Sequence, residues 1–175
     1  MLMKILEAGG IPPLTDGIRE ADDNNPRGYY EFERVKALPE GDTAWLSEAE
    51  GKAVKIISAL LKYLPDLYQY RVLYIERKMG EILASQRKML QDRGKDAEKI
   101  SDPELAALFT EHNQGALDWL GQQNNIQLLI LNYNQIIAEP EKEIQRIADF
   151  MDWDLNQQAM ADVVDRRLYR QRKPG

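Results

Sequence analysis

Two nearly uninterrupted apolar runs, YRVLYIE (70–76) and IQLLILNY (126–133), restrict the fold more than any other feature of this sequence. Such runs are typical of parallel strands that are covered on both faces. Helical patterns follow both runs, over 79–93 and from Pro140 onward, and a shorter β-branched run, KAVKIIS (52–58), precedes them. Strands that alternate with helices predict an α/β fold, with a mainly parallel sheet and helices on both sides in three α/β/α layers.

Further helices are predicted outside the runs that alternate with strands. One of them has Ser101 or Asp102 as its N-terminal cap and a proline in its first turn. The segment from Ile11 to Glu50 is rich in turn residues and is expected to be irregular. With 43% hydrophobic residues in 175, we expect a single domain over 1–175 with a real core. The additional helices are predicted over 1–8, 101–123 and 155–165.

Composition and charge exclude several classes of function. The chain has 23 basic and 29 acidic residues, for a net charge of -6, which argues against a general nucleic-acid binder. It has no cysteine, so disulfides and thiolate metal sites are excluded. The acidic residues of DGIREADDNN (16–25) miss the EF-hand spacing, so no metal is expected there. No apolar run approaches the roughly 20 residues that span a bilayer, and no signal peptide is recognisable. We therefore expect a cytoplasmic protein with neither nucleic acid nor membrane as a partner.

The junction after the 70–76 run carries the clearest candidate binding residues. Arg77 ends the predicted strand, and Ser85 follows eight residues later on the predicted helix. The first turn of a helix favours anions, and an arginine can hold a phosphate with two parallel hydrogen bonds. The alternatives are an ion pair of Arg77 with Glu76 or Glu81, and a solvent-facing Ser85. No glycine-rich loop is present at this junction.

Four segments, in this order, resemble the sulfotransferase family, a group of P-loop-type proteins with bacterial members that use 3'-phosphoadenylyl sulfate as donor. NPRGYYEFE (25–33) is similar to an early segment of many bacterial members. KAVKIISALLKYLP (52–65) is similar to a strand and turn of the family. YRVLYIERKMGEILASQRKM (70–89) resembles its strand-Arg-Ser segment, and IQLLILNYNQIIAEPEKEIQRIADFM (126–151) resembles its strand-Tyr-loop-Pro-helix segment. The resemblance covers most of the chain.

The resemblance implies roles for individual residues. Arg77 and Ser85 would hold the 3'-phosphate of the nucleotide, and Tyr133 would lie near the adenine. Lys55 is a weak candidate for a catalytic residue that stabilises a sulfate oxygen, with a solvated lysine as the alternative. The product would be adenosine 3',5'-bisphosphate, no metal would be needed, and the acceptor, a small molecule or a glycan, stays open. An acceptor pocket would be lined by Arg27, Tyr29 and Tyr30, or these would be loop residues that pack on the sheet.

Two departures from the family pattern bear on activity. In the family, a strand and a phosphate-binding loop open directly into a helix, and MLMKILEAGG (1–10) resembles that helix without them. We therefore expect a chain that is inactive or impaired, with an incomplete sheet through which copies could associate. Many members also place a histidine just after the strand that corresponds to 52–58, where this sequence has Ser58. The sole histidine, His112, is interpreted as an exposed side chain on a different helix.

Two other functions remain open at this stage. A non-catalytic nucleotide-binding or protein-interaction domain could reuse the scaffold. A nucleotide kinase ranks lower, because it would need a phosphate-binding loop and also a magnesium-binding acidic residue after a strand. Whether the chain is an enzyme is therefore undecided by the residues alone, although a sulfotransferase is favoured.

Overall fold

The sheet at the centre of the molecule consists of two parallel strands. The computed structural model describes residues 1–18, 29–92 and 100–164. Strand β1 (Tyr70–Glu76) pairs with β2 (Ile126–Asn132) over its whole length. Both strands coincide with the two apolar runs of the sequence, so the predicted α/β fold with a parallel sheet is confirmed.

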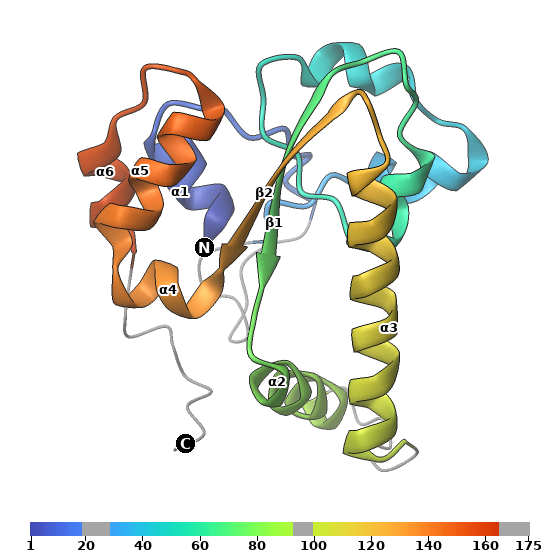
Figure 1. Cartoon of the computed structure of the whole chain (residues 1–175). Coiled ribbons are helices and arrows are strands. Elements are labelled where there is room, and N and C mark those ends of the chain that lie inside the picture. The colour runs from blue at the N-terminus through green and yellow to red at the C-terminus, as the bar shows by residue number, and fades with distance from the viewer. Residues whose placement is uncertain (19–28, 93–99, 165–175) are drawn as a thin grey trace.

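Helices cover both faces of this sheet (Figure 1). Figure 1 shows α3 on one side of the strand pair and α1, α5 and α6 on the other, as the three-layer prediction requires. Helix α3 begins at a capping box in which the Ser101 hydroxyl accepts from the Glu104 N–H and the Glu104 carboxylate accepts from the Ser101 N–H. The last helix, α6, is shorter than the predicted 155–165. It begins after Asn156, whose side chain caps it by accepting from the Ala159 N–H at 3.0 Å, and it ends at Asp162. The α-helices are α1 (Leu2–Ala8), α2 (Met79–Asp92), α3 (Asp102–Gly121), α4 (Tyr133–Ala138), α5 (Pro140–Met151) and α6 (Gln157–Asp162).

The side chains of β1 alternate between two apolar clusters. Tyr74 lies in a cluster with Leu120 of α3. Leu73 lies against the cluster on the opposite face, to which α5 contributes Ile144 and Ile147. This alternation is the period of two that a strand imposes on its side chains. Both faces of β1 are therefore apolar, as its uninterrupted sequence predicted.

The prediction of a strand over 52–58 is wrong. Ala53 forms an isolated parallel bridge with Pro13, in which the Ala53 N–H donates to Pro12 and Ala53 accepts from the Leu14 N–H, both at 2.9 Å. Within the described residues no strand lies beside the stretch that follows, and Ile57 is 61% exposed. The β-branched residues favour an extended backbone, but a strand also needs a neighbour that supplies hydrogen bonds along its length.

Three 3₁₀-helices from the irregular first part of the chain pack around a hydrophobic cluster of their own. They are η1 (Glu33–Glu40), η2 (Ala44–Ala49) and η3 (Ser58–Tyr63). Trp45 is fully buried at the centre of this cluster, and its ring forms a T-shaped contact with the Phe32 ring, with the two ring centroids 5.3 Å apart. Its indole N–H donates to the Asp42 carbonyl at 2.9 Å. One tryptophan thus organises a segment that sequence periodicity did not resolve.

In the part of the chain that the structure describes, no helix is both long and apolar enough to cross a bilayer.

Candidate functional site

A cavity of about 1340 Å³ lies beside β1. It is lined by 1–4 at the start of α1, by 49–59 and by 68–77. The Tyr70 N–H donates to the Asn125 carbonyl next to β2. Every second residue of β1, counted from Tyr70, therefore directs its backbone N–H and C=O towards β2. The residues between them direct these groups towards the opposite edge of β1. No strand pairs with that opposite edge in the described residues. The cavity therefore combines apolar walls with one strand edge whose backbone groups can bind a ligand.

Arg77 lies at the carboxyl end of β1, where it lines the cavity. Its Nε donates to a Glu81 carboxylate oxygen at 2.8 Å, and its guanidinium carbon lies 4.5 Å from the centroid of the Tyr133 ring. Glu81 is 4% exposed and also accepts from the Asn134 amide at 2.9 Å. The ion pair that sequence analysis gave as an alternative is therefore present. This ion pair uses Nε, so with respect to the described residues the two terminal nitrogens remain available for an anion.

Tyr133 begins α4, directly after β2, and its ring lines the same cavity. Burial raises the pKa of the Tyr133 phenol, Arg77 opposes this shift and Glu81 adds to it. The phenol therefore stays neutral at physiological pH. A neutral ring in contact with a guanidinium forms a cation–π pair, and the ring offers a flat apolar surface beside a positive charge.

Ser85 lies on α2 with its side chain exposed, and it does not line the cavity. The spacing of eight residues from Arg77 therefore does not bring the two side chains to one wall of the cavity in this structure. Joint binding of a phosphate by Arg77 and Ser85 stays a prediction.

Lys55 lines the cavity and is tied to the residues that follow the undescribed segment 19–28. Its ammonium group donates to the Tyr29 carbonyl at 3.1 Å and lies 3.5 Å from a Glu31 carboxylate oxygen. It also lies 5.8 Å from the centroid of the Tyr29 ring. The lysine charge is thus partly balanced by Glu31 and held near the cavity wall.

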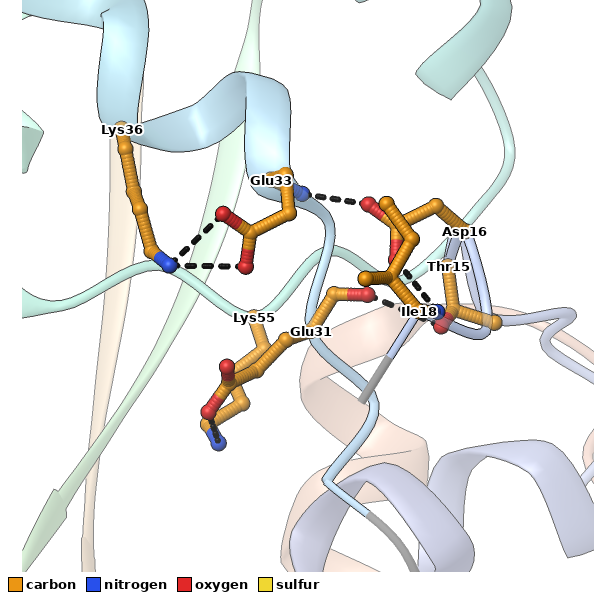
Figure 2. A network of polar contacts seen from close by, with 7 residues as sticks. All are labelled: Thr15, Asp16, Ile18, Glu31, Glu33, Lys36 and Lys55. Carbon is orange, nitrogen blue, oxygen red and sulfur yellow. Dashed lines mark hydrogen bonds and ion pairs between the residues drawn. The ribbon is translucent and has the colours of Figure 1, made fainter. Parts of the chain in front are cut away.

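A network of polar contacts attaches the 29–36 stretch to the segment that follows α1 (Figure 2). The Asp16 carboxylate accepts from the backbone N–H of Glu33 at 2.6 Å, and Thr15 donates to the Glu31 carbonyl at 2.9 Å. The first of these bonds is the main reason why the pKa of Asp16 lies below its usual value. Figure 2 shows that the network ends at the Lys55–Glu31 pair. It therefore fixes one wall of the cavity.

Of the three residues predicted for an acceptor pocket, Tyr29 and Tyr30 line the cavity, and Arg27 lies outside the described residues. Tyr30 adopts a left-handed backbone conformation (φ 52°), which is uncommon for a bulky residue. Its hydroxyl donates to the Glu7 carboxylate of α1. Burial and this hydrogen bond raise the pKa of Tyr30 to about 12.

The raised pKa of Tyr30 predicts a loss of stability at high pH. The folded pKa of about 12 lies above the ordinary value of 10.0, so the stability contribution is complete below pH 10 and is lost as pH rises towards 12. Tyr30→Phe removes this contribution and one hydrogen bond, at about 1 kcal/mol. The difference between wild type and variant in urea unfolding should therefore shrink over this pH range. A difference that is constant with pH would show that Tyr30 ionises in the folded state as it does in the unfolded chain.

Sequence analysis missed one pair of residues in the cavity. His112 of α3 places its Nε2 2.7 Å from the Ser58 hydroxyl oxygen, and both residues line the cavity. His112 is exposed, as predicted, but it is not an isolated surface side chain. The Tyr74 hydroxyl beside it donates to Asn113 at 3.1 Å. The two residues of the pair are 54 positions apart, so no local pattern marks the pair.

The described residues hold no group of three or more His, Cys, Asp or Glu that could bind a metal ion. A family model described as a sulfotransferase domain matches residues 52–174, which is more than half of the chain. The matched region contains β1, β2 and all of α3. No curated protein and no solved structure matches the chain.

Proposed function

Because this chain belongs to the sulfotransferase family, we propose that its cavity binds 3'-phosphoadenylyl sulfate and serves transfer of a sulfuryl group to a hydroxyl or amine of a small-molecule or glycan acceptor. The observation that carries the proposal is the pairing of Arg77 with Tyr133 at the carboxyl ends of two adjacent parallel strands. Ligands of open α/β sheets bind at this end of the strands. A nucleotide with a 3'-phosphate has the two groups that such a pair fits, an anion and a flat base.

The proposed reaction is an in-line displacement at sulfur. The acceptor oxygen or nitrogen forms a bond to sulfur while the bond between sulfur and the phosphate oxygen of the donor breaks. Adenosine 3',5'-bisphosphate leaves, and the acceptor loses a proton to a base. The protein contributes position and charge: Arg77 at the 3'-phosphate, Tyr133 at the base, and Lys55 towards the sulfate oxygens. Ser85 is assigned to the 3'-phosphate with Arg77, and this assignment requires that α2 carry it closer when the nucleotide binds.

Transfer by this chain is expected to be slow. Within the described residues, β1 leads to Arg77 and Lys78 and β2 leads to Tyr133, so neither strand opens into a glycine-rich turn. Such a turn supplies backbone N–H groups to a phosphate. The loss of one donor of this kind typically lowers the rate by about 10²- to 10³-fold. The same observation favours a second candidate function, a nucleotide-binding domain without catalysis.

Two measurements on the same protein test these functions. Calorimetric titration with adenosine 3',5'-bisphosphate should show saturable binding, and sulfuryl transfer from ³⁵S-labelled donor to a panel of phenol, alcohol and amine acceptors should be far below ordinary enzyme rates. Binding without any transfer would select the non-catalytic domain. Absence of binding would overturn the nucleotide site and favour a protein-interaction role. Turnover at ordinary enzyme rates would contradict the expected impairment.

A further inference from the structure

Ser58 and His112 meet at the wall of the cavity from two elements that are distant in the sequence. Ser58 is the first residue of η3, His112 lies in the middle of α3, and the Ser58 Oγ is 2.7 Å from the His112 Nε2. The cavity they line is the one that contains Arg77 and Tyr133. A serine hydroxyl at this distance from an imidazole nitrogen has the geometry of a nucleophile–base pair.

Among the described residues that contact the Ser58 hydroxyl, His112 is the group that can accept its proton. Burial raises the pKa of Tyr74, against an opposing hydrogen bond with Ser58, so the phenol remains protonated near neutral pH. The Asn113 amide accepts from that phenol and is not a base. The carboxylates of Glu50 and Glu76 and the guanidinium groups of Arg71 and Arg77 also line the cavity. In the described part of the chain, none of these four groups forms a hydrogen bond or ion pair with Ser58 or His112. Lys55 is engaged with Glu31.

We propose that His112 is the general base of this cavity and takes the proton from the hydroxyl or amine that attacks sulfur. The identity of that acceptor rests on the proposed function, whereas the proton-accepting pair rests on the geometry alone. The Ser58 hydroxyl occupies the position from which a hydroxyl can give its proton to Nε2. With its own proton on Nδ1, the imidazole accepts a hydrogen bond from an O–H at that position, and the O–H bond breaks as the oxygen forms its new bond.

The pair can be tested without knowing the acceptor, because Ser58 itself is a hydroxyl in the required place. 4-Nitrophenyl acetate supplies an activated acetyl group. The Ser58 Oγ forms a bond to the carbonyl carbon, 4-nitrophenolate leaves, and the Ser58 proton passes to the His112 Nε2. Release of nitrophenolate gives the rate, and peptide mass spectrometry after an acid quench locates the acetyl group. Ser47, an exposed serine on η2, gives the rate of an ordinary serine in the same sample.

Ser58 should be acetylated much faster than Ser47, and His112→Gln should lower the Ser58 rate by about 10²-fold or more. Gln114→Ala is the matched control, since Gln114 is exposed on the same helix and does not line the cavity. Its Ser58 rate should equal that of wild type. Circular dichroism of each variant verifies the fold. Ser58 acetylation at the Ser47 rate, or at an unchanged rate in His112→Gln, would overturn the proposal.

Failure of the nucleotide site would look different. The acetylation assay contains no nucleotide, and the titration with adenosine 3',5'-bisphosphate contains no acetyl donor, so the two measurements can fail independently of each other. If adenosine 3',5'-bisphosphate does not bind but Ser58 is acetylated in a His112-dependent manner, the proposed function fails and the base remains. If the nucleotide binds and Ser58 reacts like Ser47, the base fails and the nucleotide site remains.

Discussion

Arg77→Ala should weaken the binding of adenosine 3',5'-bisphosphate by about 10- to 150-fold, since a hydrogen bond to a charged group contributes about 1.5–3 kcal/mol. The guanidinium is held by Glu81 on one side and by the Tyr133 ring on the other. Its terminal nitrogens can therefore meet a phosphate with little loss of side-chain freedom. Calorimetric titration at constant salt measures the effect. Arg77→Lys keeps the charge but not the fork of donors, and should give an intermediate affinity.

The alanine variant also needs a stability control. It removes the guanidinium that pairs with the Glu81 carboxylate, which is 4% exposed. Breaking such a buried pair costs about 3–5 kcal/mol when burial is complete. The double variant Arg77→Ala/Glu81→Gln removes both charges and should recover much of that stability. Its nucleotide affinity should nevertheless stay as low as that of the single variant. A stable double variant that binds like wild type would show that Arg77 does not contact the nucleotide.

Trp45→Ala should lower the free energy of unfolding by about 3–5 kcal/mol, the usual loss when a buried aromatic side chain is truncated. The ring is fully buried among Val35, Leu38 and Leu46 and forms a T-shaped contact with the Phe32 ring. The space that the missing indole leaves cannot easily be filled by its neighbours, because three short 3₁₀-helices converge on this one side chain. Urea denaturation followed by circular dichroism gives the change from the midpoint and slope.

Trp45→Phe is the matched control for the tryptophan. It keeps an aromatic ring and loses the hydrogen bond from the indole N–H to the Asp42 carbonyl, so a smaller loss of about 1–2 kcal/mol is expected. Equal losses in the alanine and phenylalanine variants would show that the hydrogen bond, rather than the filled volume, stabilises the cluster. Leu46 and the residues just after η2 line the cavity, so the alanine variant should also weaken nucleotide binding.

The two strands could be predicted because their sequences carry the whole signal. β1 and β2 are apolar at nearly every position, and this pattern depends only on burial of both faces. KAVKIIS has the same local preference, yet only Ala53 pairs, through a bridge with Pro13. Whether an extended stretch becomes a strand is decided by the neighbour that supplies its hydrogen bonds, and the stretch itself contains no information about that neighbour.

The candidate site was predictable to the extent that its residues end strands. Arg77 and Tyr133 follow β1 and β2 directly, and parallel pairing brings the ends of adjacent strands together. Ser85 was chosen by spacing along a helix, which fixes position but not the direction of the side chain, and it is exposed. The Ser58–His112 contact arises where α3 lies against η3. Such a contact depends on the packing angle of two elements, for which the sequence has no short-range signal.

The parallel pairing of β1 with β2 also sets an order for folding. Each residue of β1 pairs with a residue 56 positions later, as in the bond between Arg71 and Gln127. A parallel pair cannot form through a hairpin. The chain must therefore close a long loop, at a cost in entropy, before any hydrogen bond of the sheet can stabilise it. On a ribosome, β1 therefore waits without its partner until α2, α3 and β2 have been made. We expect the late closure of this loop to limit the folding rate, and Leu131, which is fully buried in β2, to complete the core only at that step.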